Sequence, residues 1–221
     1  MASQATPATS AIRDSIVRVV EDRGAGLVAH YYSDPQFAGA LFDDFGENPT
    51  DRFTADDLMA VSLLDVRFGP EAVRALLVVH VADDLLADVA TSLPLWEADY
   101  DTVLGKGSSA GRLWARLRDI RGIGRTRASK LLARKRPALL PILDSVVGDA
   151  LGLGAVGSCL ALHDALADGQ IRTAIDGMSP GLDGPAPSTL RLLDVATWMR
   201  FSESKNARSV RQTLGLPVAH R

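Results

Sequence analysis

The chain of 221 residues contains one cysteine, and aromatic side chains make up only 5% of it. A single cysteine excludes a disulfide framework and a Cys-rich metal or iron–sulfur site within one chain. Because Cys159 lies in the apolar run 156–162, we expect a small buried hydrophobic residue rather than a reactive thiol. Charged residues interrupt every apolar run well short of the roughly 18 residues that a membrane span needs, and the N-terminus has no apolar signal core. These absences predict a soluble, cytoplasmic protein.

Patterns typical of β-strands are also scarce. Nearly every segment repeats its apolar residues at intervals of three or four, which predicts an all-α protein. With 47% hydrophobic residues, the chain can bury a substantial core without disulfides. We expect one compact unit with these parts: a disordered lead at 1–10, an N-terminal helical region at 11–104, a second helical region at 105–180, a loop at 181–188 and a C-terminal helical segment at 189–221.

Capping residues and apolar spacing place individual helices. Thr54, followed by Asp56 and Asp57, predicts a helix start. Pro70 opens a second helix whose apolar positions run to Leu85. Residues 83–93 either continue this helix or form a separate one. Ser108 or Ser109 caps a helix that ends at Gly122. Further helices are expected at 12–22, 125–136, 145–151, 156–167, 170–176 and 188–199.

The chain is slightly acidic overall, with a formal net charge of −3, but its positive charge is concentrated between residues 105 and 137. Eleven basic residues there face one acidic residue, Asp119. The eleven are Lys106, Arg112, Arg116, Arg118, Arg121, Arg125, Arg127, Lys130, Arg134, Lys135 and Arg136. Such a segment attracts polyanions, and phosphate contacts release counterions. It predicts a DNA- or RNA-binding surface; the alternative is a solvated helical face paired with acidic residues elsewhere.

The stretch Gly122-Ile123-Gly124 lies between two of the expected helices. Glycine permits a positive φ and a close approach to the backbone, so we expect a tight reversal there, with Ile123 as an apolar plug beneath it. Amides of the turn and of the next helix would face outward as donors to an anion. The expected nucleic-acid contacts are Gly122, Ile123, Gly124, Arg125, Arg127, Lys130, Arg134 and Lys135.

The apolar, glycine and small residues at this turn resemble the helix-hairpin-helix motif. They are Ile120, Gly122, Ile123, Gly124 and Ala128. In the DNA glycosylase superfamily that carries this hairpin, a Gly/Pro-containing loop and then an aspartate at a helix start follow, and Pro137, Pro141 and Asp144 match that order. The similarity covers residues 108–154. It implies a helix-hairpin-helix DNA-glycosylase-like fold and a base-excising activity in DNA repair.

The same resemblance implies a role for Asp144, and it argues against a lyase. Asp144 would stabilise the oxocarbenium-like centre left by the departing base, or activate water. Bifunctional members carry a lysine where this chain has Thr126, so the mechanism would be monofunctional. Arg121 replaces the proline that commonly precedes the first glycine. The alternative for Asp144 is plain N-capping of the helix that begins at Ser145.

A base-excising enzyme also needs walls against which a flipped base can stack. Tyr31 and Tyr32, beside His30, are the candidates for such a pocket, whereas Trp114 and Trp198 fall on apolar stripes and are expected in the core. The acidic pairs 43–44, 56–57 and 83–84 point around their helices, so we expect solvated carboxylates and no metal site. No cofactor, membrane or protein partner is implied.

Three hypotheses follow from these patterns. The first is a nucleic-acid-binding protein that resembles a monofunctional DNA glycosylase. The second is a non-catalytic helix-hairpin-helix module that binds DNA or RNA. The third is a small-molecule enzyme in which Asp144 and Tyr31 or Tyr32 line the cleft.

Overall fold

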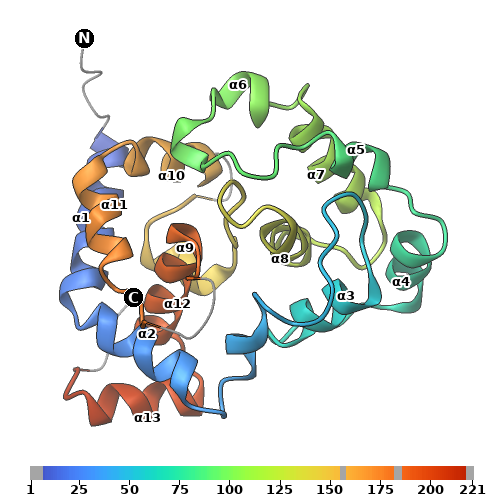
Figure 1. Cartoon of the computed structure of the whole chain (residues 1–221). Coiled ribbons are helices and arrows are strands. Elements are labelled where there is room, and N and C mark those ends of the chain that lie inside the picture. Colours follow the sequence, from blue (N-terminus) through green and yellow to red (C-terminus); the bar gives the residue numbers. More distant parts are fainter. Residues whose placement is uncertain (1–6, 155–157, 182–185, 218–221) are drawn as a thin grey trace. The chain divides into compact units, whose positions relative to one another are not determined.

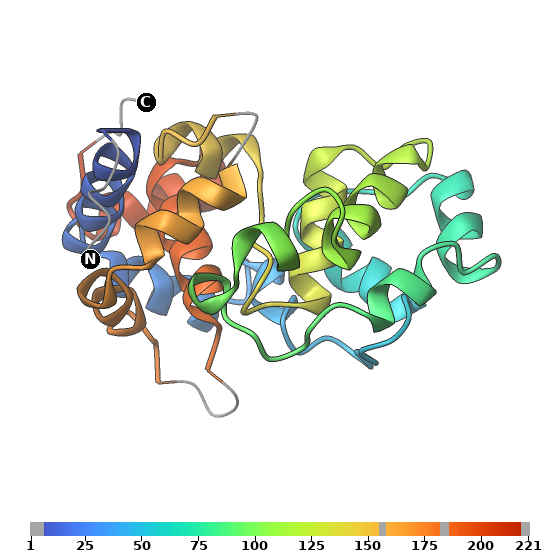
Figure 2. The ribbon, with the colours of Figure 1, turned by 90° about the horizontal axis from the view of Figure 1, so that it is seen from above.

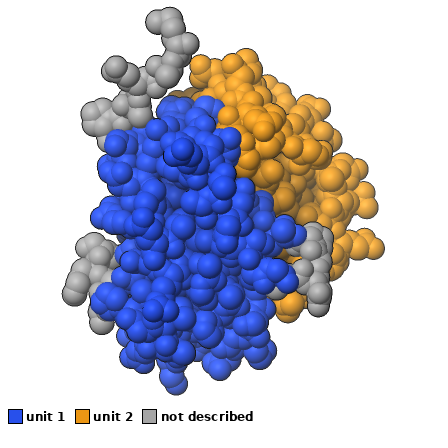
Figure 3. Space-filling view, turned by 60° about the vertical axis from the view of Figure 1, so that its left-hand side comes forward, with its two compact units in different colours: residues 1–37, 144–221 blue, residues 38–143 orange. Residues whose placement is uncertain are grey.

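The computed structural model describes residues 7–154, 158–181 and 186–217, and all regular structure in these ranges is helical (Figure 1). The prediction of an all-α protein is confirmed. The chain forms two compact units instead of the expected one (Figure 3). Unit 1 consists of residues 1–37 and 144–221, and unit 2 consists of residues 38–143. The boundaries that we expected after residues 104 and 180 therefore do not separate the units.

The expected lead and loop agree with the structure only in part. Residues 1–6 of the lead lie outside the described residues, but α1 (Pro7–Glu21) already includes the last four residues of the lead. Of the expected loop at 181–188, residues 182–185 lie outside the described residues. Gly181 and residues 186–188 are not helical.

Unit 1 is organised around a helix that is buried on almost every side. This helix is α12 (Thr189–Phe201), and most of the other helices of the unit pack against it. A helix that is surrounded by protein needs no apolar stripe, and its polar side chains must find partners inside the unit. The other helices of unit 1 are α1, α2 (Gly24–Ser33), α9 (Ser145–Ala150), α10 (Ser158–Leu166), α11 (Gly169–Asp176) and α13 (Lys205–Thr213).

Unit 2 is organised around α8 (Arg125–Lys135), against which α3 (Ala55–Ser62) and α7 (Ser109–Asp119) pack (Figures 1 and 2). The apolar core includes the fully buried Leu113, Leu117 and Leu131. The remaining elements are η1 (Ala38–Leu41), α4 (Pro70–Leu77), α5 (Asp83–Ala87), η2 (Leu95–Glu97) and α6 (Tyr100–Val103).

Most helix starts follow from the capping residues in the sequence. The side chain of Thr54 caps α3, that of Ser108 caps α7, and Pro70 is the first residue of α4. The helix that Pro70 opens stops at Leu77, and α5 is a separate helix. His80, in the connection, has a left-handed backbone with φ +56°. A left-handed residue ends a right-handed helix, although the apolar spacing continues past this point.

No helix within the described ranges combines the length and the apolar character needed to cross a bilayer.

The only cysteine of the sequence, Cys159, lies on α10 and is half-buried as a residue, and the burial of its thiol raises the pKa to about 12. Because the thiolate is the reactive form, alkylation at pH 8 should be far slower in the native protein than in the unfolded chain, and it should increase steadily as the pH rises. The measurement is the rate of iodoacetamide modification followed by mass spectrometry, with the urea-unfolded chain as control. Equal rates for native and unfolded protein at pH 8 would contradict the burial of this thiol.

Candidate nucleic-acid interface

The predicted reversal between α7 and α8 is present in unit 2. α7 ends at Asp119, and the amide of Ile123 donates to the carbonyl of Ile120 at 2.9 Å to close the turn. Gly122 has φ +87°, which a side chain would disfavour. Ile123 is only 2% exposed and belongs to the apolar core of the unit, as its expected role as a plug requires.

Gly124 occupies the N-cap position of α8 and leaves this end of the helix open. It has no side chain with which to accept a hydrogen bond from the first amides of the helix. Both Gly122 and Gly124 are exposed, and a Cβ atom added to either would meet no atom within 4 Å. The backbone at the start of α8 is therefore accessible to a ligand.

The charges beside this helix start are the reverse of the usual arrangement. Acidic residues near the N-terminus of a helix are favourable because they complement the positive end of its dipole. Four other α-helices of unit 2, α3, α4, α5 and α6, carry acidic residues in their first turn. The first turn of α8 has none and instead contains Arg125 and Arg127. Its positive end therefore has no anionic neighbour within its own first turn.

The arginine residues at the turn are at least partly accessible. Arg125 and Arg127 are half-exposed, and Arg127 is held by a hydrogen bond of 2.7 Å from its Nε to the carbonyl of Arg67. Arg121 precedes the first glycine with 86% of its side chain exposed, and it pairs with Glu71 at 3.1 Å. An exposed ion pair of this kind contributes little to stability and is easily exchanged for another anion.

The basic residues farther along α8 point into the unit, and this corrects the sequence-based expectation. Lys130 is 7% exposed, Arg134 2% and Lys135 4%. Their donors are used by carbonyl groups of unit 2: Lys130 Nζ donates to Leu64 at 2.7 Å and Arg134 donates to Phe42 at 2.7 Å. These three side chains are therefore not phosphate contacts.

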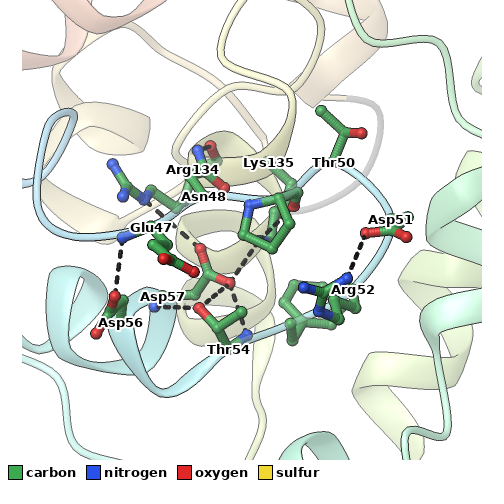
Figure 4. Close-up of polar contacts among 12 residues, drawn as sticks. Glu47, Asn48, Thr50, Asp51, Arg52, Thr54, Asp56, Asp57, Arg134 and Lys135 are labelled. Atoms are coloured by element: carbon green, nitrogen blue, oxygen red, sulfur yellow. Dashed lines mark hydrogen bonds and ion pairs between the residues drawn. The ribbon is translucent and has the colours of Figure 1, made fainter.

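A buried carboxylate lies among these cations (Figure 4). Asp57 is fully buried, and its Oδ2 is 2.5 Å from Lys135 Nζ, while its Oδ1 is 3.6 Å from Arg134 Nε. The same Oδ2 accepts a hydrogen bond of 2.8 Å from the amide of Thr54, as part of the capping box that begins α3. Burial lowers the pKa of Lys135, and the hydrogen bond and charge of Asp57 oppose this shift. We expected Asp57 to be solvated, and that expectation is wrong.

Arg136, just after α8, is the largest of the fully buried side chains. Its guanidinium donates to the carbonyls of Val89 at 2.9 Å, Thr50 at 2.9 Å, Leu86 at 2.5 Å and Lys135 at 2.8 Å. Buried carbonyl groups need donors, and the loops around the end of α8 obtain them from this side chain. The only sequence feature that could have indicated this buried arginine is the density of basic residues next to Pro137.

The loop before α3 is held to the same end of α8. Arg134 donates to the carbonyls of Asp43 and Phe45 as well as to Phe42, and Lys135 donates to the carbonyl of Pro49 at 2.9 Å. Asn48 completes the attachment with a hydrogen bond of 2.9 Å from its Nδ2 to the carbonyl of Arg134. The basic end of α8 therefore fixes loops of unit 2 in place.

Asp144 begins α9 as its N-cap, and its Oδ1 accepts a hydrogen bond of 2.9 Å from the amide of Val147. The residue is half-buried. Within the described part of the chain, Oδ2 of this carboxylate has no hydrogen-bond partner. Asp144 belongs to unit 1, whereas the hairpin belongs to unit 2. Capping is thus observed, and a catalytic role remains a prediction.

The two candidate pocket residues lie in an aromatic cluster of unit 1. The ring of Tyr31 is 5.3 Å from those of Tyr32 and Phe37 and 6.3 Å from that of Trp198. Tyr31 is 5% exposed, and its hydroxyl accepts a hydrogen bond of 3.0 Å from Arg191. Tyr31 therefore packs in the core of the unit, while Tyr32, which is half-exposed, is the better placed of the two to meet a ligand.

Comparison with known protein families gives a match that extends from α2 to the end of α12. The matching description is "Family of unknown function (DUF6308)", over residues 25–201. The chain belongs to this family. The matched range includes the hairpin, the buried cluster around Asp57 and the N-cap Asp144. No curated protein and no solved structure matches the chain.

The buried contacts of Arg136 predict a large effect on stability. Arg136→Met keeps an apolar stem but leaves the carbonyls of Val89, Thr50 and Leu86 without this donor, and each buried unsatisfied group costs about 1–3 kcal/mol. We expect the free energy of unfolding in urea to fall by about 3 kcal/mol or more. Arg121→Met is the control, because an exposed substitution changes stability by about 0.5 kcal/mol or less. Equal urea midpoints for the two variants would show that these contacts do not stabilise unit 2.

Proposed function

We propose that the protein binds the phosphate backbone of nucleic acid, and of DNA in particular, through the hairpin between α7 and α8. The observation that carries the proposal is the start of α8, where an exposed helix N-terminus lacks a side-chain cap and is flanked by arginine residues. The amides of a helix's first turn and the helix dipole favour an anion there. Guanidinium groups at the same place favour a phosphate, which they can bind through two hydrogen bonds at once.

The resemblance to the helix-hairpin-helix motif supports this proposal independently of the charge. The residues that resemble the motif span the end of α7, the turn and the first half of α8, and Ala128 is fully buried, so the two helices can approach closely. Exposed glycines at the turn leave the space that a sugar–phosphate chain needs. DNA is the proposed ligand because the resembling superfamily acts on DNA.

Replacing Gly124 with aspartate tests the proposal because stability and binding should respond in opposite directions. The backbone of Gly124 is extended, with φ −83° and ψ −177°, and there is space for a side chain. An N-cap aspartate would accept the first amides of α8, so the stability of Gly124→Asp should be unchanged or higher by a few tenths of a kcal/mol. Affinity for duplex DNA at low salt, measured by fluorescence anisotropy, should fall at least tenfold.

Gly107→Asp is the matched control for charge. Gly107 is also an exposed glycine of the basic segment, and a Cβ atom there would meet no atom within 4 Å. This variant has the same net charge as Gly124→Asp but leaves the start of α8 open. If both variants lost affinity equally, general repulsion would explain the loss and the helix start would not be the site.

Base excision through Asp144 is a second candidate function. The observation that favours it is that one oxygen of this carboxylate caps α9, while the other has no hydrogen-bond partner among the described residues. An ionised carboxylate with one unused oxygen can stabilise a developing positive charge or orient a water molecule. The position also matches the aspartate of the resembling superfamily.

Asp144→Asn separates this chemistry from capping, because asparagine caps a helix about as well as aspartate does. We expect thermal stability and DNA affinity to be retained and the release of damaged bases to be lost. The assay would measure abasic sites in a panel of damaged-base duplexes by alkaline cleavage. Product formation at the wild-type rate in Asp144→Asn would remove Asp144 from the reaction. Absence of product from the wild-type protein on every duplex would leave binding alone as the proposal.

A further inference from the structure

We infer that Ser129 is a positioning residue for Asp144, because its hydroxyl holds the segment that leads into Asp144 against α8. The inference rests on the base excision proposed above, and it names a residue that serves this chemistry without touching the substrate. It follows from the hydrogen bonds of a buried serine on the second helix of the hairpin and from the course of the chain after that helix.

Ser129 is a buried neutral residue of α8, and its hydroxyl acts both as a donor and as an acceptor. The residue is 1% exposed. The hydroxyl donates to the carbonyl of Thr126 at 3.0 Å and accepts a hydrogen bond of 3.0 Å from the amide of Leu143. Alanine is a better helix former, and a buried hydroxyl is costly unless it is hydrogen-bonded, so the helix alone gives no reason for a serine here. The contact with Leu143 supplies that reason.

The amide of Leu143 is the last anchored amide before Asp144. Earlier in the segment, the amide of Leu140 donates to the carbonyl of Arg136 at 2.9 Å, and Pro141 has no N–H group. Between Pro141 and Asp144, the amide of Leu143 is the only one for which the described part of the chain provides an acceptor. The serine hydroxyl therefore fixes the point at which the chain leaves unit 2.

Apolar packing of the same segment does not fix this point as closely. Leu139 and Ile142 are buried in the core of unit 2, but apolar burial is non-directional, whereas a hydrogen bond sets the distance between two particular atoms. One peptide bond joins Leu143 to Asp144, so a shift of the Leu143 backbone displaces the residue that carries the carboxylate. A reacting group must be held within about 0.5 Å of its productive position.

Ser129→Ala removes the acceptor and leaves a side chain that suits a helix. We expect the single-turnover rate of base release, at saturating protein, to fall about tenfold to a hundredfold, as a displacement of about 1 Å can cause. Affinity for the same duplex should be unchanged, because Ser129 is buried. A purely structural role would lower the fraction of folded protein, which thermal unfolding measures, but not the rate per folded molecule.

Two further variants isolate the hydroxyl. Ser129→Thr keeps it and should recover most of the lost rate. Asn48→Ala is the matched control, since it also removes one neutral side-chain hydrogen bond with α8, from Asn48 Nδ2 to the carbonyl of Arg134 at 2.9 Å, but on the loop before α3. Its rate of base release should be that of the wild type.

Hydrogen exchange followed by NMR gives a readout that needs no activity. An amide exchanges faster when the contact that protects it is lost. The amide of Leu143 should exchange faster in Ser129→Ala than in the wild type, and at the wild-type rate in Asn48→Ala.

Each outcome bears on a particular statement. Slower release and faster exchange in Ser129→Ala, with neither in Asn48→Ala, support the positioning role. Release at the wild-type rate in Ser129→Ala, an equal loss in Asn48→Ala, or a folded Ser129→Thr as slow as the alanine variant would overturn it and leave base excision in place. Unchanged exchange of the Leu143 amide in Ser129→Ala would also overturn it, because the hydroxyl would not anchor the segment. Absence of product from the wild-type protein on every duplex would overturn base excision and, with it, this inference.

Discussion

The structure of unit 2 depends on hydrogen bonds between cations at the end of α8 and the backbone carbonyls of the loops around it. Arg134, Lys135 and Arg136 follow one another in the chain, and each holds a different set of carbonyl groups. One carboxylate, Asp57, lies among them and also begins α3. A buried carbonyl without a donor is costly, so these side chains determine where the loops can lie. Charge that looks suited to an external polyanion is used inside the protein.

The two ends of α8 consequently have different roles. The C-terminal half is buried, and its side chains hydrogen-bond to the loops around it, which holds this end of the helix in place within the unit. The N-terminal end is exposed, glycine-flanked and without a cap. A helix start that is to bind an anion should be fixed in place, since ordering it on binding would reduce affinity. The inward cations can thus support the proposed site without contacting the ligand.

Much of the local structure could be predicted from the sequence, because its signals act over a few residues. Thr54, Pro70 and Ser108 marked helix starts correctly, and the glycines at 122 and 124 marked the turn. The direction of charged side chains could not be predicted, because it depends on loops distant in sequence. Lys130 was expected to contact phosphate and Asp57 to be solvated, yet both have partners inside unit 2. The division into two units was missed for the same reason, since it depends on contacts between the chain's two ends.

The composition of unit 1 from two distant segments has a consequence for biosynthesis. Its first segment, residues 1–37, leaves the ribosome long before its complement, residues 144–221, has been translated. Unit 2 is continuous in sequence, and domains generally fold as units during synthesis. The nascent chain can therefore complete the hairpin-bearing unit first. The packing of α1 and α2 against the central helix α12 can form only after α12 has been synthesised.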